Sequence, residues 1–125
     1  DVPTLNNEGV NGLYHNSRGD VGADCWGKRA EWVNLTSTIG DEDLSLVIFD
    51  HPGNVGFPTY WHARTYGLFS ANPLGQEVFS KGDEVLNFKL EPGESTTWKH
   101  RVLLVSGSKM DKEALDKRFA DFSNE

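Results

Sequence analysis

Glycine and proline divide this chain into short segments, and this feature limits its fold more than any other. The 125 residues include 13 Gly and 5 Pro, and 37% of the residues are hydrophobic. Between the turn residues lie apolar or alternating runs of the length that strands have. We therefore expect one domain over residues 1–125, mainly antiparallel β and folded as a β-sandwich, with one C-terminal helix.

The expected strands are apolar or alternating runs bounded by turn residues. Residues 44–49 form a short apolar run, and the preceding Gly40-Asp41 pair predicts a hairpin with the strand before it. A second hairpin is expected around Pro92-Gly93, because residues 85–90 alternate between apolar and polar. Residues 1–12 are rich in turn formers and are expected to form an entry loop. The other strands are expected over residues 13–16, 28–38, 63–71, 74–79 and 95–105.

The C-terminal segment changes to the period of a helix. Leu115, Phe119 and Phe122 are spaced to lie on one helix face. Asp111 is placed to cap this helix, and Met110 precedes the cap where it can pack against Leu115 as a hydrophobic staple.

Charge and composition exclude several classes of partner. The formal net charge is -7, and no run of Lys or Arg could follow a phosphate backbone, so we expect no nucleic-acid partner. No apolar run approaches the roughly 20 residues that cross a bilayer, so we expect a soluble chain without a membrane partner. The single Cys25 cannot form an internal disulfide.

Residues 50–74 contain the densest group of side chains capable of chemistry. A strand that ends at Asp50, a loop rich in Pro and Gly, and a strand that begins near Ala63 would bring His51, His62 and Arg64 together. The candidate catalytic residues are therefore Asp50, His51, His62 and Arg64. In the simpler interpretation, the histidines only bind loop backbone.

Aromatic and charged residues in the loops are candidates for ligand binding. Trp26, Tyr60 and Trp61 are either plugs over the end of the core or platforms on which a ligand ring stacks. The nearby cations suit a hydroxylated or carboxylated small molecule, although they could instead pair with neighbouring carboxylates. The candidate binding residues are His15, Arg18, Asp24, Trp26, Lys28, Tyr60 and Trp61.

A metal site would require histidines that are far apart in sequence to converge. If His15, His51 and His62 met, Asp24 or Asp50 could complete the ligand set. The spacing matches no dedicated metal motif, so we assign no metal ligand, and the cofactor stays unknown.

Two long segments resemble a bacterial domain family of unknown function that often carries the label "methane oxygenase PmoA". They are residues 15–33, HNSRGDVGADCWGKRAEWV, and the stretch from Asp50-His51-Pro52 to Asn72-Pro73-Leu74-Gly75. The resemblance covers nearly the whole chain and implies the C-terminal half of a longer domain. It also implies a β-sandwich similar to galactose-mutarotase-like proteins, a part in bacterial carbohydrate breakdown, and a periplasmic or secreted location.

These observations leave functions of different classes open. The favoured one is an enzyme that acts on a saccharide or a sugar-derived substrate, and the alternative is a carbohydrate-binding or accessory module. An oxygenase subunit is disfavoured, because such a subunit lies in the membrane and this chain has no spanning segment. If half of a larger sandwich is missing, we expect exposed apolar surface that the missing N-terminal half or a second copy in a homodimer would cover.

Overall fold

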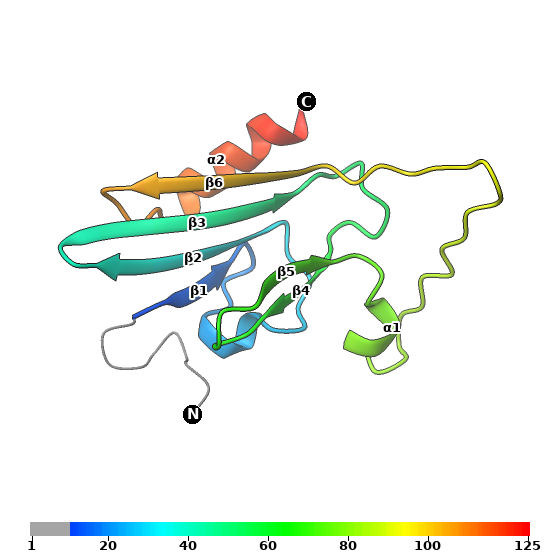
Figure 1. Cartoon of the computed structure of the whole chain (residues 1–125), viewed down its shortest axis with the longest axis horizontal. Coiled ribbons are helices and arrows are strands. Elements are labelled where there is room, and N and C mark those ends of the chain that lie inside the picture. The colour runs from blue at the N-terminus through cyan, green and yellow to red at the C-terminus, as the bar shows by residue number, and fades with distance from the viewer. Residues whose placement is uncertain (1–10) are drawn as a thin grey trace.

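A four-stranded antiparallel sheet forms the centre of the molecule. The computed structural model describes residues 11–125, so most of the entry loop expected over residues 1–12 lies outside the described residues. The strands pair in the order β1-β2-β3-β6, as Figure 1 shows. They are β1 (Leu13–Asn16), β2 (Trp32–Ile39), β3 (Glu42–Asp50) and β6 (His100–Ser106).

The first hairpin was predicted correctly. β2 and β3 pair from Trp32↔Phe49 to Ile39↔Glu42, and Gly40 makes the turn with a φ of 61°. The strand expected over residues 28–38 begins later, at Trp32, because Arg29 and Ala30 instead bond to the segment around Thr59 and Tyr60.

Residues 63–71 were predicted as one strand, but they contain the end of one strand, a turn over residues 64–68 and most of the next strand, so this prediction was wrong. β4 (Tyr60–Ala63) and β5 (Phe69–Asn72) pair as a small antiparallel sheet. Arg64 N donates to Leu68 O (2.8 Å), and Gly67 adopts a φ of 96° that L side chains rarely tolerate. The apolar residues that suggested a continuous strand, Tyr66 and Leu68, lie exposed at the turn.

Two further predicted strands are absent from the described part of the chain. Residues 74–79 contain the short helix α1 (Gln76–Phe79), and residues 85–90 form no ladder with residues 95–99. Residues 80–99 instead form an arm that projects from the body (Figure 1). The predicted turn does form, with Glu94 N donating to Glu91 O (2.9 Å), and Phe88 contacts Trp98 across the arm.

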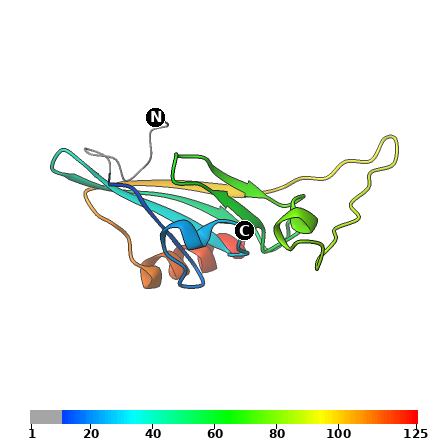
Figure 2. The ribbon, with the colours of Figure 1, turned by 90° about the horizontal axis from the view of Figure 1, so that it is seen from below.

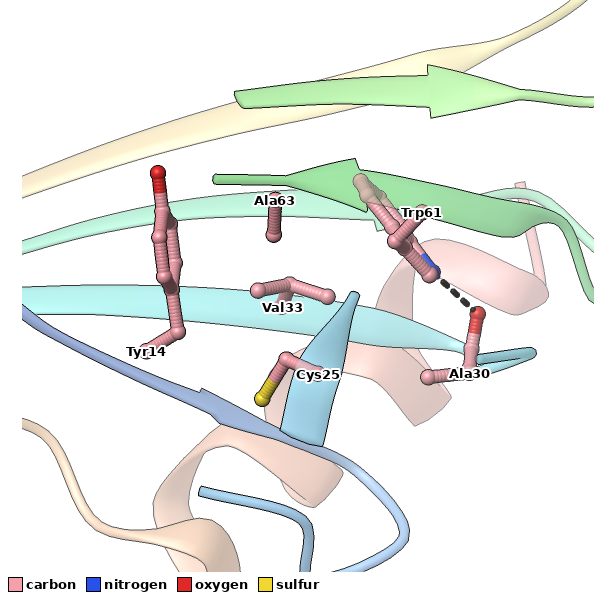
Figure 3. Packing of buried hydrophobic residues seen from close by; sticks show 6 residues of the cluster. All are labelled: Tyr14, Cys25, Ala30, Val33, Trp61 and Ala63. Carbon is pink, nitrogen blue, oxygen red and sulfur yellow. Dashed lines mark hydrogen bonds between the residues drawn. The ribbon is translucent and has the colours of Figure 1, made fainter. Parts of the chain in front are cut away.

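The large sheet is covered on both faces. Figure 2 shows α2 (Lys112–Ser123) on one side and the β4–β5 hairpin on the other. Between the sheet and the hairpin, Figure 3 shows the cluster Tyr14, Cys25, Ala30, Val33, Trp61 and Ala63. Between the sheet and α2 lie Trp32, Val47, Phe49, Leu115 and Phe122. The prediction of a mainly antiparallel β fold with a C-terminal helix is confirmed.

The helix begins as predicted. Asp111 is the N-cap of α2, and its carboxylate accepts a hydrogen bond from Ala114 N (2.9 Å). Met110 packs against the cluster that contains Leu115, as the staple requires.

Candidate functional site

The structure separates the four candidate catalytic residues into two places. Asp50 ends β3, and its neighbour His51 packs edge-to-face on Phe122 of α2 (5.1 Å between ring centroids). His62 lies on β4 and contacts Arg64 on the hairpin side of the sheet. The predicted loop therefore does not assemble one site from all four residues.

Asp50 is a buried structural carboxylate. Its Oδ1 accepts from Asn54 Nδ2 (2.7 Å) and lies 3.3 Å from His100 Nε2, while its Oδ2 accepts from Thr59 N (2.9 Å). Asn54 in turn bonds to the backbone of Lys99 with both its amide nitrogen and its oxygen. Asp50 thus connects the loop over residues 51–59, through Asn54 and Thr59, to His100 at the beginning of β6.

Burial has the largest effect on the pKa of this carboxylate. Asp50 is 1% exposed, and desolvation raises the pKa of Asp50, although hydrogen bonds from Asn54 and Thr59 oppose the shift. His51 Nδ1 accepts from Gly53 N (2.9 Å), while its buried Nε2 has no hydrogen-bond partner among the described residues. A substrate has no direct access to Asp50 in this arrangement.

Two of the candidate catalytic residues, His62 and Arg64, join two aromatic residues in a partly exposed cluster, which we call the Trp26 surface. It consists of Trp26, His62, Arg64 and Phe79. Arg64 Cζ lies 4.3 Å from the centre of the Trp26 ring, and the Phe79 ring packs edge-on against it at 5.5 Å. Trp26 is nevertheless 38% exposed, so part of its ring is open to a ligand.

The alternation of β4 explains why His62 reaches this surface. Trp61 and Ala63 point into the core, so His62 between them points away from it. Trp26 follows the 3₁₀ turn η1 (Gly22–Cys25), and the next residue, Gly27, donates its N–H to Trp61 O (2.8 Å). The backbone of β4 therefore fixes Trp26 beside His62.

Arg64 carries donor groups that no carboxylate of residues 11–125 neutralises. Its Nε donates to His62 Nε2 (3.4 Å). Within residues 11–125 no Asp or Glu lies within ion-pair distance of Arg64. A hollow of about 130 Å³ adjoins it, lined by Ala23, Trp26, Ala63, Arg64 and Thr65.

Sequence reasoning missed two residues that support the Trp26 surface. Phe79 stacks on Tyr60 (5.5 Å, 17° between planes), and Glu84 accepts from the Tyr60 hydroxyl (2.6 Å) and pairs with Arg29. Burial and the Glu84 hydrogen bond raise the pKa of Tyr60. Their sequence signal was weak, because Phe79 was expected in a strand and Glu84 lies in a turn-forming segment.

The other predicted binding residues have varied surroundings. Trp61 is fully buried and donates to Ala30 O, which makes it a plug in the core (Figure 3). Tyr60 is 6% exposed and supports Phe79. Arg18 pairs with Glu31, as the simpler interpretation expected. Asp24 and Lys28 are exposed on either side of Trp26 in sequence.

The histidines considered for a metal lie in different surroundings. His15 lines a cavity of about 280 Å³ between the sheet and the start of α2, away from the contacts of His51 and His62. Among residues 11–125 no group of three or more His, Cys, Asp or Glu side chains is arranged to hold a metal ion.

The same residues include no helix that is long and apolar enough to cross a bilayer.

Comparison with known proteins gives one match. The model of a family described as "Family of unknown function (DUF6807)" matches residues 2–120. No curated protein and no solved structure matches this chain. The family match covers nearly the whole sequence and agrees with the sequence resemblance to a family without an assigned function. The chain belongs to the DUF6807 family.

Proposed function

We propose that this protein binds a carboxylated saccharide at the Trp26 surface. The observation that carries the proposal is the position of Arg64, whose guanidinium lies over Trp26 beside a hollow and has no carboxylate partner within the described residues. A sugar carboxylate would supply the missing partner through charge-assisted hydrogen bonds. The carbohydrate part of the proposal also rests on the family resemblance.

The chemistry of the neighbouring groups suits a sugar ring. The exposed part of Trp26 offers an apolar face on which the C–H face of a pyranose can pack. His62 Nδ1–H is a donor for a hydroxyl oxygen when Nε2 accepts from Arg64. Phe79 and Tyr60 hold the surface in place from behind through stacked rings.

Binding has more support than catalysis in this geometry. A catalytic proton transfer needs an accessible acid or base, and Asp50 is 1% exposed with both carboxylate oxygens already bonded. His62 is the remaining candidate base, because it is partly exposed at the Trp26 surface, and its Nε2 can accept a proton once the hydrogen bond from Arg64 is released. We therefore place the carbohydrate-binding module first and an enzyme with His62 at its centre second.

The test uses Arg64→Ala and a matched control. Isothermal titration with oligogalacturonate as the probe should give an affinity that falls roughly tenfold or more in Arg64→Ala, because hydrogen bonds to a charged group are lost. Arg18→Ala removes another exposed arginine, which is already paired with Glu31, and should leave the affinity unchanged. A neutral oligosaccharide of the same length should bind more weakly than oligogalacturonate to the unchanged protein.

Equal binding of the charged and neutral probes, or equal losses in the two arginine variants, would exclude the proposed site.

The enzymatic alternative is tested with His62→Ala. Turnover of the same probe that disappears in His62→Ala while affinity is retained would establish an enzyme, and the absence of turnover in the unchanged protein supports a binding module.

A further inference from the structure

Within residues 11–125, β6 is an open edge of the large sheet. It pairs with β3 on one side only, and Figure 1 shows no other strand of the described residues beyond it. Leu103 packs against the cluster under α2, so Val102 and Leu104 on either side of it point to the opposite face, where they are 64% and 69% exposed. The β4–β5 hairpin covers β1, β2 and, at Ile48, part of β3 on that face and leaves these two side chains bare. The edge therefore presents both free backbone groups and apolar side chains.

This edge lacks the features that usually protect an exposed strand. The sequence of β6, HRVLLVS, contains no Pro or Lys, and its pairing with β3 is regular over seven residues without a bulge. Its one arginine, Arg101, is paired with Glu125 at the end of α2. Such an edge is a template for another strand.

The sequence of β6 fits a second copy of itself. We propose that two copies of this chain associate through antiparallel pairing of their β6 strands, with Leu103 opposite Leu103 on the two-fold axis. This register places Val102 opposite Leu104 twice, so the four most exposed apolar side chains of the edge meet on one face. The two four-stranded sheets then form one continuous sheet.

The charges of the strand are compatible with this register. Arg101 faces Val105 and His100 faces Ser106, so no like charges are opposite each other. The two Arg101 residues are four positions apart along the strands, or roughly 14 Å at about 3.4 Å per residue. That separation exceeds the screening length of about 8 Å at physiological salt. α2 lies on one face of the sheet and not in its plane (Figure 2), so it does not occupy the edge at which the second copy would pair.

Sedimentation velocity over a concentration series tests the association. The unchanged protein should be a reversible dimer, and the double variant Val102→Lys, Leu104→Lys should be a monomer at the same concentrations. Ile39→Lys is the matched control, because Ile39 is 68% exposed at the tip of the first hairpin and should leave the dimer intact. Circular dichroism checks that all variants fold. A monomer at every concentration, or a dimer that survives the double variant, would overturn the proposal.

A distance measurement tests the register. Ser106 of one copy is opposite His100 of the other, so spin labels on Ser106→Cys should be separated by six positions, or roughly 20 Å between backbones. The native Cys25 is fully buried and is replaced by Ala for this measurement. Backbones in direct contact at position 106 would show parallel pairing and would overturn the antiparallel register.

Discussion

Arginines of similar appearance in the sequence have different surroundings in the structure. Arg18 pairs with Glu31 and Arg29 with Glu84, while Arg64 lies on Trp26. Glu84 is far from Arg29 in sequence, so the pairing of Arg29 follows from tertiary structure. The sequence could therefore nominate Arg64, but only the fold distinguishes it from the paired arginines.

Burial likewise decides which of the predicted site residues can reach a ligand. Tyr60, Trp61 and His62 are consecutive, yet the first two are buried and only His62 is partly open. Alternation within β4 turns Trp61 into the core and places Tyr60 and His62 on the other face, where Phe79 stacks on Tyr60 while His62 stays partly open. This arrangement was not predictable, because the strand was expected to begin at residue 63. Asp50 was nominated for chemistry on its residue type, whereas its hydrogen bonds give it a structural role.

Cys25 gives a prediction at the residue scale. Burial, followed by the charges of Asp20 and Asp24, raises the pKa of Cys25 to about 12. Because the thiolate is the reactive form, we expect Ellman's reagent to label the native protein very slowly at neutral pH and completely in guanidinium chloride. A Ser95→Cys variant, with its new thiol on the exposed arm, provides the control and should react immediately. Rapid labelling of native Cys25 would contradict its burial.

Elements with a local signal were predictable, and those that depend on partners were not. The hairpin at Gly40 and the helix after Asp111 have turn and cap residues that act within a few positions. Residues 85–90 alternate as a strand does, but a strand also needs a partner to satisfy its backbone. In the arm the two segments meet through Phe88 and Trp98 without forming a ladder.

The cap of α2 gives a prediction at the scale of the element. Asp111→Ala removes the acceptor for Ala114 N and should lower the free energy of unfolding by about 1 kcal/mol. Asp111→Asn retains an acceptor and should cost much less. Asp121→Ala, in the last turn of the same helix, controls for the loss of an exposed carboxylate. Urea unfolding measures all three, and equal effects of the two alanine variants would contradict the cap.

At the scale of the whole molecule, the large sheet joins two separate cores. One cluster lies under the hairpin and the other under α2, and β2 contributes Val33 to the first and Trp32 to the second. Trp32 Nε1 also donates to Asp116 of α2 (3.1 Å). The layered β fold was predictable because short apolar or alternating runs are separated by turn residues, but the pairing order that leaves β6 at an edge was not.

Asp50 connects three parts of this architecture. The free energy of unfolding of the whole chain should therefore depend on whether the Asp50 carboxyl group is protonated. Its carboxylate joins the end of β3 to the loop at Asn54 and Thr59 and to His100 at the start of β6. Burial raises its folded-state pKa above the ordinary value of 3.8. As the pH rises from below that value, the unfolded chain therefore ionises first and is favoured.

Comparison of the unchanged protein with Asp50→Asn isolates this effect, because the other titrating groups are common to both. The stability of the unchanged protein relative to Asp50→Asn should be greatest below pH 3.8 and should decrease until the pH exceeds the folded-state pKa. Urea unfolding of both proteins at a series of pH values measures the difference. A relative stability that increases with pH would show that the hydrogen bonds from Asn54 and Thr59 and the nearby His100 outweigh burial, which would reverse the assigned direction of the pKa shift.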